Sequence, residues 1–341
     1  MSREWINYLK SQGAWLSGED GQIHFPASKK SIAQVCVLSD QTIIIASGCD
    51  TVRFLQGQLT CNIATLAPMK QTVGTVCTPR GRMYSTFTIG NANTHYLLRM
   101  HKGVAENFIT GLGKYAVFYK SELSRPAESY ICLGLAGSNI EHALQSLDLK
   151  LPDTTSFMKA DAGWLLKTAH LDNSYEWWIP AAELPRIWEK LIPHFSPTGE
   201  TFWRQRRIAA VIPEVKPEIV EKYIPQDLNL PSLGYVSFQK GCYTGQEIVA
   251  RMQNLGQQKK RTYSITITGT NKVAANAKLL DEKGKTIGEI LESVAIAHDK
   301  YEALAVLKIN AKEVFLDNQP ECQITINAIP YTIDARAELQ F

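Results

Sequence analysis

The sequence predicts an α+β protein, with a body of mixed antiparallel sheets and helices followed by a C-terminal all-β barrel. Helix-spaced apolar stripes and β-branched runs alternate irregularly over residues 1–255, whereas residues 256–341 hold only short strand-like runs separated by turns. The length of 341 residues also exceeds the roughly 250–300 residues that one hydrophobic core supports. We therefore expect a body of two intertwined subdomains over residues 1–255 and a barrel over residues 256–341.

Each expected element of the first part of the body has a local cause. Strands are expected where β-branched or aromatic residues cluster, and helices where apolar residues recur at three- and four-residue spacing. In chain order we expect a short helix from Trp5, a hairpin of residues 34–38 and 42–46 turning at Ser39-Asp40, a helix capped by Asp50 or Thr51, a three-strand meander of residues 72–78, 82–89 and 95–100, a helix over 104–112 and a strand over 116–119.

The middle of the chain repeats this mixture and then loses its periodicity. We expect strands over residues 130–135, 164–168 and 176–179, and helices over residues 139–147, 182–191 and 200–210. Residues 211–239 are rich in proline and have little periodicity, which predicts a long structured loop. Beyond Gly256, five short strands are expected, over residues 262–268, 286–291, 303–309, 323–326 and 330–333.

Composition and charge exclude several classes of protein. The net charge of +3 is smaller than that of most nucleic-acid-binding proteins, although basic clusters occur at residues 204–207 and 259–261. A solvated helix or strand face is the expected explanation of each cluster. The N-terminus has no apolar signal segment, and no run is long enough to cross a membrane. A cytoplasmic protein without a membrane partner is expected.

The cysteines are scattered and odd in number. The seven positions include no C-x-x-C pair, so neither a structural zinc site nor a disulfide framework is expected, and no metal site is predicted. Free thiols at this density are typical of a reducing compartment.

The densest group of chemical functions is the segment Lys-Gly-Cys-Tyr-Thr-Gly-Gln-Glu at residues 240–247. Thr244 and Glu247 fit a capping box at the start of a helix. Cys242 would then precede a helix N-terminus beside Lys240, a setting that favours a reactive thiolate. The alternative, on the local residues alone, is an ordinary capped helix in which Cys242 is a small buried apolar residue.

The segment 240–247, followed by Ile-Val-Ala-Arg at residues 248–251, resembles the signature of the YgfZ family. These are folate-binding proteins related to the aminomethyltransferase (T-protein) of the glycine cleavage system. Further motifs occur in the family's order: F-L-Q-G-Q-x-T at residues 54–60, G-R-M at 81–83, K-Y-A-V-F at 114–118, and I-P-Q with Asn229 at 224–229.

The resemblance implies a T-protein-like, folate-binding body that takes tetrahydrofolate or a derivative. It also implies a role in supporting iron–sulfur enzymes, including those that thiolate tRNA. Iron–sulfur assembly proteins or cluster-containing tRNA-modifying enzymes would then be partners. Direct binding of nucleic acid through residues 204–207 and 259–261 remains a separate alternative.

The resemblance also assigns site residues. Cys242 would be the functional thiol, within a motif formed by Lys240, Gly241, Cys242, Tyr243, Gly245, Gln246, Glu247 and Arg251. For folate, the implied contacts are Trp203 as a stacking platform, Gln41 in place of a second tryptophan, and Tyr115, Gln226 and Asn229 around the pocket. The alternatives are that Trp203 and Tyr115 belong to the core, and that Gln226 and Asn229 order the long loop.

Two departures from the related aminomethyltransferases bear on catalysis and on folate. Those enzymes carry an Asp-Asp pair where this chain has Ser85-Thr86, and a hydroxyl supplies neither the charge nor the basicity of a carboxylate. We therefore expect a protein that is not, or only weakly, catalytic, with a folate-dependent one-carbon transferase as the alternative. Ala209 stands where relatives often carry Glu, and Val211 where they carry Gly, so pterin recognition is expected to differ.

Overall fold

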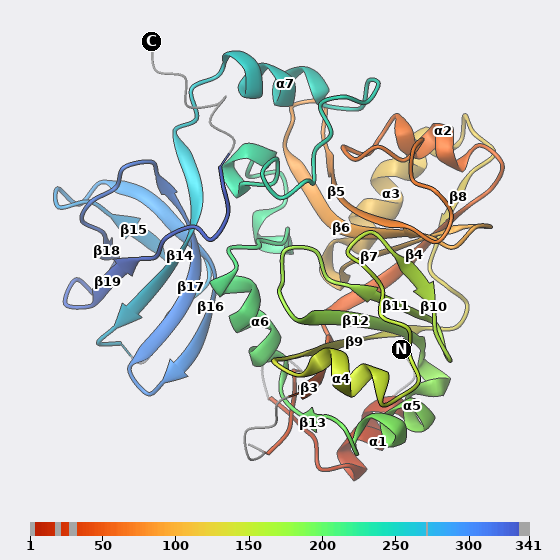
Figure 1. The fold of residues 1–341 in the computed structure, drawn as a ribbon. Coiled ribbons are helices and arrows are strands. Elements are labelled where there is room, and N and C mark those ends of the chain that lie inside the picture. Colours follow the sequence, from red (N-terminus) through yellow and green to blue (C-terminus); the bar gives the residue numbers. More distant parts are fainter. Residues whose placement is uncertain (1–3, 18–21, 27–32, 271, 334–341) are drawn as a thin grey trace. The chain divides into compact units, whose positions relative to one another are not determined.

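The computed structural model describes residues 4–17, 22–26, 33–270 and 272–333, and Figure 1 shows its ribbon. The chain forms two compact units that are interleaved along the sequence. Unit 1 comprises residues 1–55, 63–73 and 87–203, and unit 2 comprises residues 56–62, 74–86 and 204–341. Residues 204–255 therefore belong to the same compact unit as the C-terminal strands.

Unit 1 is built around a sheet, which has six strands in the part of the chain that the structure describes. Its strands are antiparallel except for one parallel edge pair, and their spatial order is β10 (Phe157–Lys159), β11 (Trp164–Lys167), β12 (Ser174–Pro180), β9 (Tyr130–Gly137), β3 (Ala33–Val37) and β13 (Ser196–Pro197). Helices cover this sheet with apolar residues such as Leu9, Leu144 and Trp188. The helices of unit 1 are α1 (Glu4–Ser11), α3 (Ala105–Ala116), α4 (Ile140–Gln145) and α5 (Leu184–Leu191), with 3-10 turns η1 (Lys102–Val104) and η2 (Ala181–Glu183).

A second sheet contains the predicted meander. Its order is β5 (Gln71–Cys77), β6 (Met83–Asn91), β7 (Tyr96–His101), β4 (Gln41–Ser47) and β8 (Glu122–Ser124), which confirms the meander. Strands β5 and β6 and helices α2 (Thr51–Gln56) and α6 (Glu200–Ala209) each have residues in both units. A two-residue ladder joins β1 (Trp15–Leu16) to β2 (Ile23–His24).

Two predicted elements of unit 1 are wrong. Residues 34–38 and 42–46 form no hairpin, since β3 pairs with β9 and β4 pairs with β7 and β8. Neither Ser39 nor Asp40, both described, has the positive φ that a two-residue hairpin turn requires. The expected strand over 116–119 is instead the end of α3 and a turn, and the side chains of Val117 and Phe118 are exposed there.

A buried ion pair links the two main sheets of unit 1. Arg99 on β7 donates to both carboxylate oxygens of Glu176 on β12, at 2.8 and 3.1 Å. The indole N–H of Trp178 donates to the same carboxylate at 2.8 Å, and Glu176 is 1% exposed. Because the carboxylate is bonded on both oxygens, the pair tolerates burial and fixes the two strands relative to each other.

Unit 2 contains a nearly closed antiparallel barrel of six strands among its described residues. Their order is β18 (Phe315–Leu316), β15 (Lys278–Leu280), β16 (Thr286–Ala297), β17 (Lys300–Lys308), β14 (Lys260–Thr268) and β19 (Gln323–Ile326). Irregular pairing at Leu279–Leu280, Ile290–Glu292 and Ala295–Ala297 marks bulges of the kind that curve a sheet. Four of the five predicted strands are confirmed; residues 330–333 form no strand.

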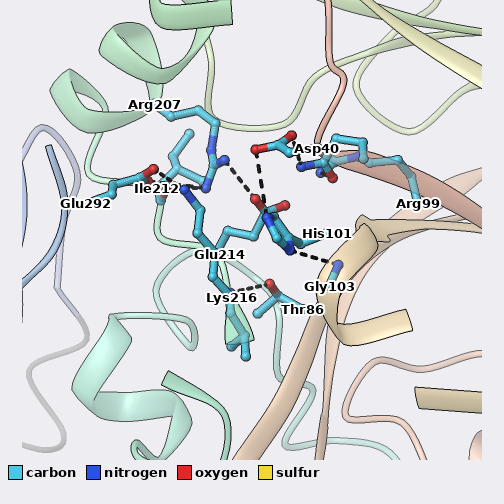
Figure 2. Close-up of polar contacts among 12 residues, drawn as sticks. Asp40, Thr86, Arg99, His101, Gly103, Arg207, Ile212, Glu214, Lys216 and Glu292 are labelled. Carbon is cyan, nitrogen blue, oxygen red and sulfur yellow. Dashed lines mark hydrogen bonds and ion pairs between the residues drawn. The ribbon is translucent and has the colours of Figure 1, made fainter. Parts of the chain in front are cut away.

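The proline-rich segment 211–239 is a structured loop, as predicted, with 3-10 turns η3 (Pro217–Ile219) and η4 (Pro225–Leu228). Figure 2 shows how its first part is held: Arg207 donates to Glu214 at 3.1 Å, and Lys216 donates to Glu292 of β16 at 2.5 Å. Burial alone would raise the pKa of Glu292, but the charges of Lys216 and Arg207 hold it below its usual range. A second anchor lies nearby in the sequence, where Lys222 and Tyr223 donate to Glu289.

Candidate functional site

The signature loop, residues 240–245, lies in unit 2 and leads into helix α7 (Gln246–Leu255). Its residues alternate in exposure: Lys240 and Tyr243 are buried, whereas Gly241 and Cys242 between them are exposed. Two side chains therefore point into the unit and hold the loop, and the thiol between them faces outward.

Lys240 is the inner anchor of this loop. Its ammonium donates to the carbonyl oxygens of Gln56 at 2.7 Å, of Cys61 at 3.0 Å, and of Leu59. It also lies 5.1 Å from the centre of the Tyr243 ring, a cation–π contact. Lys240 is 7% exposed, and burial lowers its pKa to about 8. The sequence predicted that this charge would support the thiolate of Cys242, but the ammonium is directed into the segment 56–61 instead.

Thr244 binds the same part of unit 2, and Tyr243 before it is buried. The backbone N–H of Thr244 donates to Gly57 at 3.2 Å, and its hydroxyl donates to the side chain of Gln58 at 3.0 Å. Burial raises the pKa of Tyr243 above its usual range, and its hydroxyl has no hydrogen-bond partner in the described part of the chain. From the sequence, residues 54–60 are identified only as a family motif, and Cys61 lies outside it. The role of residues 56–61 as acceptors for Lys240 depends on main-chain carbonyls, which carry no sequence signal.

Gly245 is the N-cap of α7, and the backbone at this position requires a glycine. Its φ is +85°, and a Cβ at this position would lie 2.4 Å from the carbonyl oxygen of Thr78. The predicted Thr244–Glu247 capping box is wrong, because the helix begins at Gln246 and the Thr244 hydroxyl is used by Gln58. Gln246 instead turns back, and its side-chain oxygen accepts from the N–H of Tyr243 at 3.3 Å.

Cys242 is exposed, which excludes the alternative that it is a small buried core residue. All seven cysteines are described, and only Cys49 is also exposed. The other five are buried, and burial raises the pKa of each of them, to about 12 for Cys61 and Cys77. The buried thiols therefore stay protonated and unreactive at neutral pH, whereas Cys242 is open to reagents and partners.

The remaining motif residues, Glu247 and Arg251, lie on the exposed side of α7. The favourable i,i+4 pair is not formed, since the described contacts include no ion pair between these two side chains. Within the described ranges, no three His, Cys, Asp or Glu side chains are grouped as a metal ion would require.

Two of the predicted folate contacts are held inside unit 1. Trp203 is 4% exposed, and its ring lies so close to Gly134 on β9 that a Cβ there would be 2.7 Å away. Gln41 donates to Asp40 at 2.8 Å and accepts from Arg99 at 3.0 Å. Trp203 is thus a core residue packed against the sheet, and the Gln41 amide is already bonded at both ends.

The other three predicted folate contacts differ in environment. Tyr115 is 39% exposed at the end of α3, so it is not a core residue. Asn229 has φ +57° and fastens η4 to β14, donating to Thr262 at 2.8 Å and to Tyr331 at 3.0 Å. Gln226 donates to Val249 of α7 at 2.8 Å, and its buried side-chain oxygen has no partner among the described residues.

Three of the four positions that depart from the aminomethyltransferases are buried in the protein. Ser85 is 0% exposed, and the Thr86 hydroxyl accepts from the N–H of Val215 at 3.0 Å (Figure 2). Val211 is buried with φ +52°, a conformation that a β-branched residue adopts only with strain. A glycine at this position would adopt the same φ without strain. Ala209 is exposed at the end of α6.

Comparison with known proteins first defines the fold. The crystal structure of the glycine cleavage system aminomethyltransferase T from Bartonella henselae matches with a TM-score of 0.77 and covers 96% of this chain and 97% of its own, at 16% sequence identity. The chain therefore has the fold of aminomethyltransferase T. No protein-family model matches the sequence.

Curated relatives then define the family. The tRNA-modifying protein YgfZ of Photorhabdus laumondii is 30% identical over 319 residues, covering 91% of this chain and 96% of the relative. The protein of the same name from Aliivibrio fischeri strain MJ11 is 30% identical over 312 residues, covering 88% and 93%. The chain belongs to the YgfZ family. Among the described residues, no helix has the length and apolar character needed to span a membrane.

The two glycines of the signature loop give a matched test of its geometry. Gly245→Ala places a Cβ against the Thr78 carbonyl at a positive φ, and we expect it to lower the free energy of unfolding by about 2 kcal/mol or more. Gly241→Ala, whose Cβ would meet no described atom within 4 Å, is expected to change it by less than about 0.5 kcal/mol. Urea unfolding measures both, and equal effects would contradict the described loop.

Burial of Lys240 predicts a dependence of stability on pH. Its pKa falls from 10.5 to about 8 on folding, so the unfolded chain binds more protons between these values and the cost of burying the charge is relieved as pH rises. At about 1.4 kcal/mol per pH unit, wild type should gain roughly 3 kcal/mol relative to Lys240→Met between neutral pH and 10.5. Denaturant unfolding across this range measures the difference; a flat difference would exclude the burial described here.

Proposed function

We propose that this protein supports iron–sulfur enzymes, and through them tRNA modification, with Cys242 as its working thiol and a tetrahydrofolate as its ligand. The observation that carries the proposal is the exposure of Cys242 on a loop whose neighbouring residues are fixed. Five of the other six cysteines are buried, so the chain keeps this thiol accessible while protecting most of the rest.

The fixed loop suits a thiol that acts on a partner. Lys240 and Thr244 on either side are bonded to the segment 56–61, so Cys242 is presented without a large loss of loop entropy when a partner binds. One thiolate cannot hold an iron–sulfur cluster, which usually has four ligands, and the described residues around it offer no further group of ligands. The cluster would therefore be substrate, with the remaining ligands on the partner enzyme.

The proposed link to tRNA modification is supported by family membership. The relatives from Photorhabdus laumondii and Aliivibrio fischeri are both named tRNA-modifying proteins. The proposed folate ligand is supported by the shared fold of aminomethyltransferase T. These supports are independent of Cys242.

The five predicted folate contacts fit a bound folate poorly as a set. Trp203 is packed in the core, and the amides of Gln41 and Asn229 are used by the protein itself. Gln226 fits better, because its buried oxygen could accept from a pterin N–H. We therefore assign no chemical step to folate. The hydroxyls of Ser85 and Thr86 make aminomethyl transfer the weaker alternative, because no carboxylate stands at either position.

The thiol is tested by complementation of cells that lack the protein. We expect Cys242→Ala to fold normally but to fail to restore iron–sulfur-dependent tRNA thiolation, measured by mass spectrometry of the modified nucleosides. Cys49→Ala removes the other exposed thiol and should restore it fully. Full restoration by Cys242→Ala would show that the thiol is dispensable and would refute the proposed role.

Folate binding is tested by calorimetric titration with tetrahydrofolate. Wild type is expected to bind, and Gln226→Leu to bind at least tenfold more weakly, since a pterin donor would lose its acceptor. Trp203→Phe is the control for indirect effects, because it retains a ring in the core. Absence of binding to wild type at millimolar tetrahydrofolate would remove the folate part of the proposal and leave the thiol part standing.

A further inference from the structure

Unit 1 carries a group of exposed aromatic and cationic side chains at the end of α3 and on the turn that follows. Phe118 is 82% exposed, Val117 76% and Tyr115 39%. Two exposed lysines, Lys114 and Lys120, flank these residues in the sequence. We define the aromatic turn as Arg53 together with residues 114–120, Lys-Tyr-Ala-Val-Phe-Tyr-Lys.

This turn is held firmly rather than left loose. The N–H of Lys120 donates to the Asp50 carboxylate at 3.0 Å, and its carbonyl accepts from the N–H of Asp50 at 3.2 Å. Gly48 has φ +118° and lies so close that a Cβ would be 2.2 Å from the same carbonyl. The hydroxyls of Thr51 and Ser121 are 2.9 Å apart and join the two segments once more. Figure 1 shows α3 leading through this turn into β8.

The third aromatic ring of the turn already lies beside a cation. The guanidinium of Arg53 is 5.7 Å from the centre of the Tyr119 ring, whose other neighbour is Phe54 at 5.4 Å between ring centres. Arg53 is therefore held beside the ring of Tyr119, the residue that follows the exposed Phe118 in the chain.

Exposed apolar side chains that lie together on a folded protein usually mark a binding surface. The charges nearby favour an anionic ligand: Arg53, Lys114 and Lys120 are exposed cations, against the carboxylates of Asp50 and Glu122. The Asp50 carboxylate is in addition engaged by the N–H of Lys120. The ligand should therefore combine flat apolar faces with negative charge.

We propose that the aromatic turn binds single-stranded RNA. Bases would stack on Phe118 and Tyr115, and phosphates would pair with Lys114, Lys120 and Arg53, since single strands are bound by aromatic platforms set among cations. The turn has a lysine at each end of a run that contains three aromatic rings, and this arrangement suits stacked bases whose phosphates lie on either side. This inference rests on the proposed function and deepens it, because it supplies the surface that would meet an unpaired part of a tRNA.

The probe is a fluorescein-labelled, unstructured RNA of 12 nucleotides, with binding followed by fluorescence anisotropy from 50 to 200 mM salt. Phe118→Ala should weaken binding about tenfold because one base no longer stacks, with the salt dependence unchanged. Lys114→Ala with Lys120→Ala should reduce the slope of log affinity against log salt by about 1.4, or about 0.7 for each phosphate that is no longer neutralised. All three side chains are exposed, so circular dichroism should show an intact fold.

Two controls separate this surface from others. Leu255→Ala removes another exposed apolar side chain, and Lys259→Ala with Lys260→Ala removes the rival basic cluster; both should bind RNA as wild type does. Unchanged affinity in Phe118→Ala would overturn the proposal. An equally large decrease in affinity in the Lys259 and Lys260 variant would overturn it as well, as would self-association of wild type that Phe118→Ala abolishes, since the surface would then bind a second copy.

Failure of this inference is distinguishable from failure of the proposed function. Cys242→Ala should bind the RNA probe as tightly as wild type. If Cys242→Ala complements fully while Phe118→Ala still binds RNA more weakly, the proposed thiol role fails and the RNA surface stands. If Phe118→Ala binds RNA normally and Cys242→Ala fails to complement, the RNA surface fails and the proposed thiol role stands.

Discussion

The arrangement of the signature loop depends on one buried ammonium. Lys240 donates to three main-chain carbonyls of the segment 56–61, far away in the sequence, and its charge is covered by the Tyr243 ring. Removing a charged amine from water is costly, and the three carbonyls offset only part of that cost, since burial still lowers the pKa of Lys240. With Lys240 and Tyr243 turned inward, the two residues between them are left outside. The exposure of Cys242 is thus a consequence of where the lysine goes.

The two glycines of the signature loop differ in how strongly the surrounding structure constrains them. Gly245 is confined by the Thr78 carbonyl and by its positive φ, whereas Gly241 has open space. The first glycine is required by the path of the backbone, and the second adds no bulk beside the thiol. Val211 shows the opposite case, because a buried valine accepts a left-handed conformation at a cost of order 1–3 kcal/mol. Its carbonyl accepts from the hydroxyl of Tyr331, and this hydrogen bond helps to hold the strained turn.

Local pattern was sufficient for much of the fold. The meander, four barrel strands and helix α3 follow from periodicity, because their apolar residues face a core. Local pattern does not predict which distant strands pair with each other. The hairpin expected at Ser39-Asp40 is wrong because β3 pairs with β9 and β4 pairs with β7. The strand expected over 116–119 fails because its apolar side chains face outward, which propensity alone cannot reveal. For the site, the motif indicates a reactive Cys242. The binding of Lys240 to main-chain carbonyls leaves no pattern in the side chains, so the sequence cannot predict it. For Trp203 the sequence permits both a folate contact and a core position, because either use requires a large aromatic ring.

Amide hydrogen exchange in Lys240→Met tests most directly whether this lysine holds the loop. In wild type the N–H of Thr244 donates to Gly57, and we expect it to exchange slowly. In Lys240→Met we expect its exchange to accelerate at least tenfold together with residues 240–245, while the N–H groups of β14 and β17 keep their protection. Unchanged protection of Thr244 in Lys240→Met, with the barrel equally protected, would contradict a loop held by the Lys240 ammonium.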